Sequence, residues 1–210
     1  GFAELDKMTT GLHGGEMIVI AARPAMGKTS LAMNIAEYVT LEQKLPCGVF
    51  SLEMTSESLV LRLMCSRARV NLRNIREGFL VDRDFPKLTK AAGLLSSSPL
   101  FIDDTPGLSI LQLRAKARRM HQQFGIKLFV IDYLQLLHST ARKAADNRQQ
   151  EIADISSGIK SLAKELDVPV IILCQLNRDV EKRGEGAKPK LSDLRESGAI
   201  EQDADLVGLL

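Results

Sequence analysis

Residues 21–30, AARPAMGKTS, nearly match the phosphate-binding loop pattern G-x-x-x-x-G-K-[ST]. Ala22 stands where that pattern has its first glycine. The apolar run EMIVIAA at 16–22 precedes the loop, and residues 29–42 follow it with the apolar spacing of a helix. A strand, a glycine-lysine turn and an amphipathic helix form the context of this loop, so the sequence predicts a nucleotide-binding site.

Each residue of the predicted loop can be assigned a role from the needs of a bound phosphate. Backbone N–H groups and a helix N-terminus bind phosphate oxygens, and Gly27 allows the backbone to approach closely. Lys28 places a cation on the outer phosphates, and the Thr29 hydroxyl can ligate Mg²⁺. Alanine suffices at position 22 if its φ stays negative, because that position mainly lets the strand turn. The predicted nucleotide-binding residues are Ala22, Arg23, Pro24, Ala25, Met26, Gly27, Lys28, Thr29 and Ser30.

Further apolar runs predict a mainly parallel sheet. They are nearly continuous instead of alternating, which is typical of strands buried on both faces. Helical patterns lie between them, and the longest covers 147–166, where Asp146 and Gln149 predict a capping box at its start. The alternation of strand and helix predicts an α/β fold with a mainly parallel central sheet flanked by helices. The predicted strands cover 16–22, 47–53, 99–104, 126–133 and 168–175.

The composition bounds the class of protein. A chain of 210 residues fits one domain of ordinary size, and 45% hydrophobic with 26% charged residues is typical of a soluble globular protein. Aromatic residues make up only 4% of the chain, with no tryptophan, which argues against an interface built on base stacking. The net charge is only +2, so any contact with nucleic acid must come from local clusters of charge.

The cysteines and the chain ends bear on the compartment of the protein and on whether the chain is part of a longer one. Cys47, Cys65 and Cys174 are far apart and form no C-x-x-C pair, which argues against zinc and disulfides and favours reduced thiols in the cytoplasm. No apolar run reaches membrane-spanning length, and no signal peptide opens the chain. The first residues begin as if midway through a protein, and the terminal QDADLVGLL stops inside a strand-like run, so we expect a fragment of something longer.

Two strand ends compete to supply the carboxylate that would hold magnesium through water. The run PLFIDD offers Asp103 and Asp104, but the TPGLS that follows predicts a turn and a helix start, where aspartates serve as turn and cap residues. The run KLFVIDY offers Asp132 after a longer apolar stretch. We therefore favour Asp132, together with Thr29, as the metal ligands.

Two more polar residues end predicted strands. Glu53 ends CGVFSLE just before a helix cap at Thr55 or Ser56. As the carboxylate at that strand end it is the candidate base that orients the attacking water, with a surface acid near a helix start as the alternative. Gln175 ends VPVIILCQ and is the candidate sensor of the γ-phosphate, although a purely structural role is equally open.

Six motifs in a fixed order resemble a known family. They are ELDKMTTGL, ARPAMGKTS, FSLEM, VIDYLQL, QLNR and SDLRESGAIEQDAD, and together they closely resemble the C-terminal motor domain of the bacterial replicative DNA helicase of the DnaB type. The resemblance covers essentially the whole chain, and the last motif is the most specific, since nucleotide binding in general does not demand it. Alanine at position 22 is usual in this family.

The resemblance implies a fold, an activity and partners. The fold is that of a RecA-like P-loop NTPase, which binds ATP and Mg²⁺. The implied activity is that of an ATP-dependent DNA helicase in DNA replication, which hydrolyses ATP to move on single-stranded DNA and unwind duplex. Six subunits form a ring with nucleotide between neighbours, and a primase and a helicase loader are the expected partners. Residues 1–210 would then be a single motor domain, with the N-terminal domain, the linker helix and the arginine-finger segment outside them.

The resemblance also implies roles for individual residues. Lys28 and Thr29 hold the phosphates and magnesium, and Asp132 is the Walker B acid. Glu53 is the catalytic base, and Gln175 couples the γ-phosphate to the DNA loops. One DNA-facing loop carries the implied DNA-binding residues, and residues 138–149 form the other. These DNA-binding residues are Arg195, Glu196 and Gly198.

Two basic clusters have different interpretations. Lys182, Arg183, Lys188, Lys190 and Arg195 supply local positive charge in a loop after the Gln175 strand, as either a DNA contact or a solvated loop. Within 113–120, the basic residues recur near helical spacing, which favours a solvated helix face. The members of this second cluster are Arg114, Lys116 and Arg118.

Two other functions compete with a helicase motor. A RecA-like recombination or repair ATPase would share the core motifs but would need a different DNA loop from SDLRESGAIEQDAD. A nucleotide-binding scaffold without turnover is the third possibility. The presence of Glu53, Asp132 and Gln175 together argues against it, because a scaffold has no need of all three.

Overall fold

The computed structural model describes residues 2–139, 148–177, 188–194 and 198–210. These residues contain a six-stranded sheet in which every pairing between strands is parallel, in the order β3-β2-β4-β5-β1-β6. This confirms the predicted α/β class and parallel sheet. The strands are β1 (Met17–Ala22), β2 (Cys47–Ser51), β3 (Leu100–Asp103), β4 (Leu128–Asp132), β5 (Val170–Gln175) and β6 (Leu206–Leu209).

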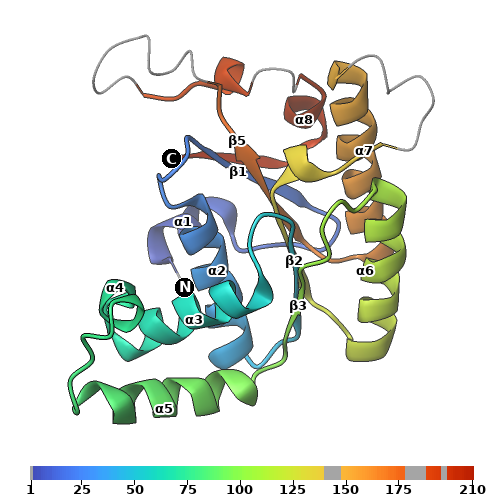
Figure 1. Cartoon of the computed structure of the whole chain (residues 1–210). Helices are drawn as coiled ribbons and strands as arrows, with labels where there is room; N and C mark the ends of the chain where they lie inside the picture. Colours follow the sequence, from blue (N-terminus) through green and yellow to red (C-terminus); the bar gives the residue numbers. More distant parts are fainter. Residues whose placement is uncertain (1, 140–147, 178–187, 195–197) are drawn as a thin grey trace.

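Helices cover both faces of this sheet (Figure 1). On one face lie α6 (Ile110–Phe124), α7 (Arg148–Leu166) and α8 (Gly198–Asp203). The other face carries the larger group, in which α5 packs against α3. This second group consists of α1 (Ala3–Thr9), α2 (Lys28–Leu41), α3 (Ser56–Ala68), α4 (Leu72–Arg76) and α5 (Asp84–Ser96). Short 3-10 turns, η1 (Leu134–Leu136) and η3 (Leu191–Asp193), follow β4 and β5.

The strands are buried on both sides, which explains their continuous apolar sequences. In β1, Met17, Val19 and Ala21 belong to the core under α6 and α7, whereas Ile18 and Ile20 belong to the core under α2 and α3. Successive side chains of a strand point to opposite faces, so a strand between two helical layers needs apolar residues at every position. Among the described residues, no helix has both the length and the apolarity needed to cross a membrane.

The parallel arrangement brings the carboxyl ends of the strands to one edge. Ser51 of β2 is paired with Asp132 of β4, and Ala22 of β1 is paired with Gln175 of β5. Ligands of open α/β sheets bind in the crevice outside these strand ends. The register therefore places the predicted site residues of four separate segments at the same edge of the sheet.

The basic side chains of α6 form ion pairs that the sequence did not predict, while Arg118 stays exposed to solvent as expected. Arg118 Nε lies 2.5 Å from Glu165 Oε1, and Arg114 Nη2 lies 3.3 Å from Glu165 Oε2. Lys116 Nζ lies 2.6 Å from Asp103 Oδ2. The reason is that α6 packs beside α7 and past the end of β3, and both of these elements present carboxylates to it. A helical spacing of charges cannot reveal such partners, because they lie far away in the sequence.

This pairing predicts a pH-dependent contribution to stability. The hydrogen bond from Arg118, assisted by Arg114, lowers the pKa of Glu165 from its ordinary value of 4.5 to about 2. A depressed carboxyl pKa stabilises the folded state above the unfolded pKa, and the gain is lost as pH falls through the folded one. Glu165→Gln should therefore unfold at a lower urea concentration than the unsubstituted chain at pH 6. The difference should shrink as the pH falls from about 4.5 to 2. A difference that does not change with pH in urea titrations would contradict this account.

Candidate nucleotide-binding site

The loop between β1 and α2 forms the floor of the site. Ala22 is the last residue of β1, is fully buried, and is not among the residues with positive φ. Its carbonyl accepts a hydrogen bond from the Leu176 backbone N–H at 3.0 Å, so the strand continues through this position and alanine fits it. The chain turns later, at Ala25 and Gly27, where φ is 64° and 91°. Residues 24–27 are exposed, so their backbone is open to a ligand.

Lys28 and Thr29 turn their side chains toward the end of β4. The Nζ atom of Lys28 lies 3.3 Å from Asp132 Oδ1, and the Thr29 hydroxyl donates a hydrogen bond of 2.7 Å to Asp132 Oδ2. The Asp132 side chain is only 3% exposed, and a carboxylate so far from water needs a positive partner and hydrogen bonds. The two loop residues supply both, so the loop and the strand end are held together by this contact.

Glu53 completes the group of predicted side chains. Its Oε2 lies 3.5 Å from Lys28 Nζ, and its side chain is 49% exposed, so it lies on the open side of the site. The Leu52 backbone N–H donates to the Asp132 carbonyl at 2.7 Å, which ties the exit of β2 to the end of β4. Thr55 is the N-cap of α3 and accepts from Ser58 N–H, so the helix begins where one of the two predicted caps places it.

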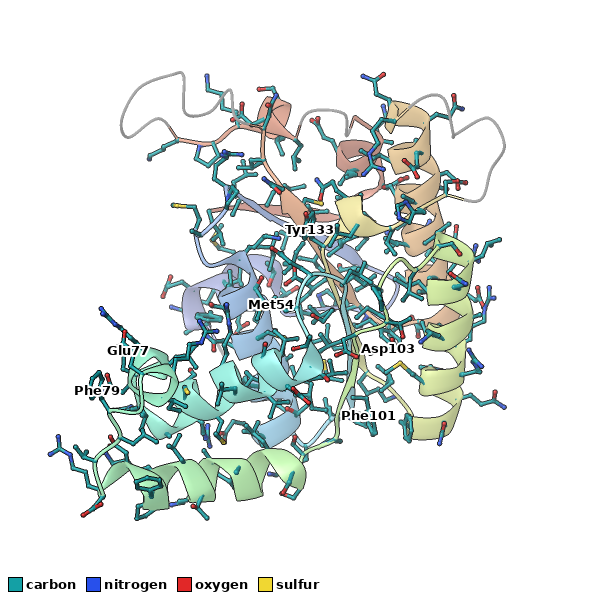
Figure 2. The ribbon with its side chains drawn as sticks, in the orientation of Figure 1. Met54, Glu77, Phe79, Phe101, Asp103 and Tyr133 are labelled. Atoms are coloured by element: carbon teal, nitrogen blue, oxygen red, sulfur yellow. The ribbon has the colours of Figure 1, made fainter. Side chains whose placement is uncertain are left out.

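The rival aspartates have structural partners elsewhere. Asp103 accepts from the Thr105 N–H and pairs with Lys116 on α6, well away from Tyr133 at the site (Figure 2). Asp104 accepts from the Ser56 N–H at the start of α3. Asp103 is a turn residue as predicted, whereas Asp104 contacts the start of α3, and Ser109 caps the helix that follows TPGLS. Asp132 is the carboxylate that lies beside the loop.

Two side chains near the site were given no role of their own from the sequence. The Lys28 ammonium lies 4.0 Å from the centre of the Tyr133 ring, a cation–π contact. Burial, and then the charges of Glu53 and Asp132, raise the pKa of Tyr133. Gln135 contacts the backbone of Gln175 with its amide group. Both residues closely follow Asp132 in the sequence, but the apolar pattern of β4 does not tell where side chains point once the strand has ended.

Two residues at the site carry oxygen atoms that suit Mg²⁺. Thr29 and Asp132 offer oxygen atoms, the donors that magnesium prefers, and Mg²⁺ commonly takes few protein ligands beside waters and substrate phosphates. Within the described ranges, no group of three or more histidine, cysteine, aspartate or glutamate side chains could hold a metal ion by itself. The cysteines take no part, because all three are free and buried, and burial raises the pKa of Cys174 to about 12.

Part of the predicted DNA-binding surface lies outside the described residues. This holds for Arg195 and Glu196, for residues 140–147 of one predicted DNA loop, and for Asp146 of the predicted capping box. Gly198 is described and is the exposed first residue of α8. The roles of these residues in DNA binding stay predictions.

The comparison with known families decides the relationship of the chain. Residues 1–210 match the model of the DnaB-like helicase C-terminal domain. The chain belongs to this family. The membership agrees with the arrangement of the loop, Glu53 and Asp132 at one edge of a RecA-like sheet.

Named relatives support the membership. The chain is 50% identical over its whole length to the replicative DNA helicase DnaC of Bacillus subtilis and 48% identical to the replicative DNA helicase DnaB of Geobacillus stearothermophilus. It covers 46% of each, so the chain spans about half the length of these curated relatives.

Two solved structures share the fold over the entire chain. A DnaB-like replicative helicase, described with its interactions with primase, superimposes with a TM-score of 0.92 at 39% identity, with 50% of that chain covered. A second solved structure, described as an ATPase domain, gives a TM-score of 0.91 at 40% identity, with 74% of that chain covered. These matches confirm the RecA-like α/β fold.

Two substitutions separate binding from turnover at this site. Lys28→Ala removes the cation predicted to meet the outer phosphates, so the affinity for ATP should fall about 10- to 100-fold. Glu53→Gln leaves the predicted phosphate-binding residues unchanged and alters only the group predicted to orient water. In the full-length protein that carries this domain, its affinity should stay within about threefold of the unsubstituted protein, while turnover falls at least about 100-fold. A fluorescent ATP analogue measures affinity, and released phosphate measures turnover. Equal loss of affinity in the two variants would show that Glu53 is misassigned.

Proposed function

We propose that this chain is the motor domain of a replicative DNA helicase, which hydrolyses ATP to move along single-stranded DNA and unwind duplex. One observation carries the proposal. Lys28, Thr29, Glu53 and Asp132 come from three separate segments and are joined by contacts of 3.5 Å or less at one sheet edge. This arrangement occurs in a domain of the DnaB-like helicase family.

The contacts of the free site suggest how it receives a nucleotide. Lys28 binds two carboxylates, and an incoming triphosphate is a more highly charged partner for its ammonium. Transfer of Lys28 to the outer phosphates would release Asp132, which together with the Thr29 hydroxyl would hold Mg²⁺, in part through water. When bound, Mg²⁺ neutralises charge that develops on the phosphates.

Glu53 and Gln175 are the residues proposed to act on the γ-phosphate. The half-exposed Glu53 has room for a water molecule, which its carboxylate would orient for attack. Gln175 leaves the sheet next to Ala22, the first residue of the loop. This proximity supports its proposed role as the sensor of the γ-phosphate.

The wider assembly follows from the family and from the open face of the loop. Residues 24–27 are exposed, which leaves room for a neighbouring subunit to complete the site, as in a ring of six with an arginine finger supplied in trans. Single-stranded DNA would pass through the ring, with Arg195, Glu196 and Gly198 on its backbone. Contacts to phosphates read no sequence, which suits a motor that must pass any base. The proposed partners are a primase and a helicase loader. The proposed location is the cytoplasm.

The proposal is tested on the full-length protein that carries this domain. ATP hydrolysis is measured with and without poly-dT, and unwinding is measured on a forked duplex, with Glu53→Gln as the variant that binds but does not turn over. Hydrolysis stimulated by DNA, together with unwinding that requires Glu53, is the expected result. Hydrolysis without any response to DNA would point to a different ATPase, and no hydrolysis at all would point to a nucleotide-binding scaffold.

In the same assays Arg195→Ala should weaken the binding of poly-dT and of mixed sequences alike. The loss of one phosphate contact should reduce the slope of log affinity against log salt by about 1. Basal hydrolysis should fall much less than the part stimulated by DNA. Unchanged affinity and slope with intact unwinding would remove Arg195 from the path of the DNA.

A further inference from the structure

The sheet opens at the point where Gln175 leaves it. The pairing of β4 with β5 ends at Ile131 and Ile172, whereas the pairing of β1 with β5 continues to Ala22 and Gln175. The last three residues of β5 are therefore paired with β1 but not with β4. On the side that faces β4, the backbone groups of Gln175 need another partner, since buried backbone groups are almost always hydrogen-bonded.

The side chain of Gln135 spans this gap. Its Nε2 donates to the Gln175 carbonyl at 3.3 Å, and its Oε1 accepts from the Gln175 N–H at 3.4 Å. One amide group thus takes the place of a neighbouring strand. An amide carries both a donor and an acceptor, which neither a carboxylate nor an aliphatic side chain of similar size can offer.

The position of Gln135 is fixed by its neighbours. It is the middle residue of η1, between the fully buried Leu134 and the buried Leu137, and it comes three residues after Asp132. Packed apolar side chains on both sides leave the backbone little freedom to move independently of the core. The amide therefore reaches Gln175 from a firm support beside the nucleotide site.

The backbone of Gln135 makes a second connection, to the start of α7. Its carbonyl accepts from Arg148 Nη2 at 2.7 Å, and Arg148 is the first residue of α7. The same guanidinium pairs with Glu151, whose carboxylate accepts from the Ser139 N–H at 3.1 Å. A continuous set of hydrogen bonds thus runs from Gln175 through Gln135 to Arg148 and Glu151.

We propose that Gln135 is a positioning residue that carries the state of the nucleotide site from Gln175 to the start of α7, at the end of the predicted DNA loop of residues 138–149, and so couples nucleotide binding to DNA binding. The inference rests on the proposed function and adds a residue to it. A shift of the Gln175 backbone must either break both amide bonds or displace Gln135 together with the packed η1 turn, and the Gln135 carbonyl is bonded to Arg148. Because these hydrogen bonds join Gln135 to Gln175 and to Arg148, the change expected in a Gln135 variant is in the coupling between nucleotide binding and DNA binding.

The test measures this coupling in the full-length protein. The dissociation constant of a labelled dT oligonucleotide is determined with and without Mg²⁺ and a non-hydrolysable ATP analogue, and the ratio of the two values is the coupling factor. Couplings of this kind are typically about 5- to 150-fold. In Gln135→Leu the factor should fall to within about twofold of one, and the effect of DNA on analogue affinity must fall equally, because binding linkage is reciprocal.

Two further variants isolate the amide. Gln122→Leu makes the same substitution at an exposed position of α6 and should keep the coupling factor of the unsubstituted protein. Gln135→Glu keeps the size and one acceptor but loses the donor to the Gln175 carbonyl, so it too should lose coupling. It replaces Gln135→Leu as the deciding variant if the leucine protein lacks a cooperative thermal transition.

The outcomes separate this inference from the proposed function. The inference is supported if a folded Gln135 variant has a coupling factor close to one, while its affinity for the ATP analogue without DNA stays within about threefold of that of the unsubstituted protein. A coupling factor equal to that of the unsubstituted protein overturns the inference. Loss of analogue affinity without DNA as large as the loss of coupling also overturns it, because the residue would then be merely structural. A coupling factor of one in the unsubstituted protein would instead contradict the proposed function itself.

Discussion

The buried carboxylate of Asp132 is the group on which the rest of the site depends. A carboxylate away from water costs several kcal/mol unless a charge and hydrogen bonds compensate it. Lys28 and Thr29 provide that compensation from the first turn of α2. The same requirement that stabilises the free protein therefore closes the loop against β4. It also leaves Lys28 and Asp132 bound to each other in the place where a phosphate and a metal would be needed.

The parallel sheet brings further polar residues to this contact. Because every strand end faces the same edge, Glu53 after β2, Asp132 at β4 and Gln175 at β5 meet near the loop without any long excursion of the chain. The helices on both faces bury the strands and keep their ends in register. At this edge side chains connect the polar groups. Where the backbone pairing of β4 and β5 has ended, the Gln135 side chain bonds to the Gln175 backbone.

Much of this arrangement was predictable from the sequence, for identifiable reasons. Continuous apolar runs indicate strands buried on both faces, and a strand, turn and helix around Gly27 and Lys28 indicate the loop. The preference for Asp132 over Asp103 followed from the turn signals after Asp103, and the structure shows Asp103 bound to Thr105 and Lys116. Local patterns were sufficient here because each signal lies within a few residues of the feature it predicts.

Contacts between distant segments were not predictable in this way. The pairing of Arg114 and Arg118 with Glu165 joins residues about 50 positions apart, and no spacing along α6 reveals it. The bridge from Gln135 to Gln175 spans 40 positions and depends on the direction of one side chain after a strand has ended. The prediction of a solvated basic helix face missed these ion pairs for this reason. The neighbours that a fold brings together are a property of its topology.

A structure of this domain with Mg²⁺ and a non-hydrolysable ATP analogue would show whether Lys28 exchanges Asp132 for phosphate. In that structure Lys28 Nζ should have left Asp132 and should contact the outer phosphates. The Thr29 hydroxyl should then bind Mg²⁺, with Asp132 reaching the ion directly or through water. A nucleotide bound away from residues 22–30, or a Lys28 that keeps its contact with Asp132 while the phosphates lie elsewhere, would contradict this exchange.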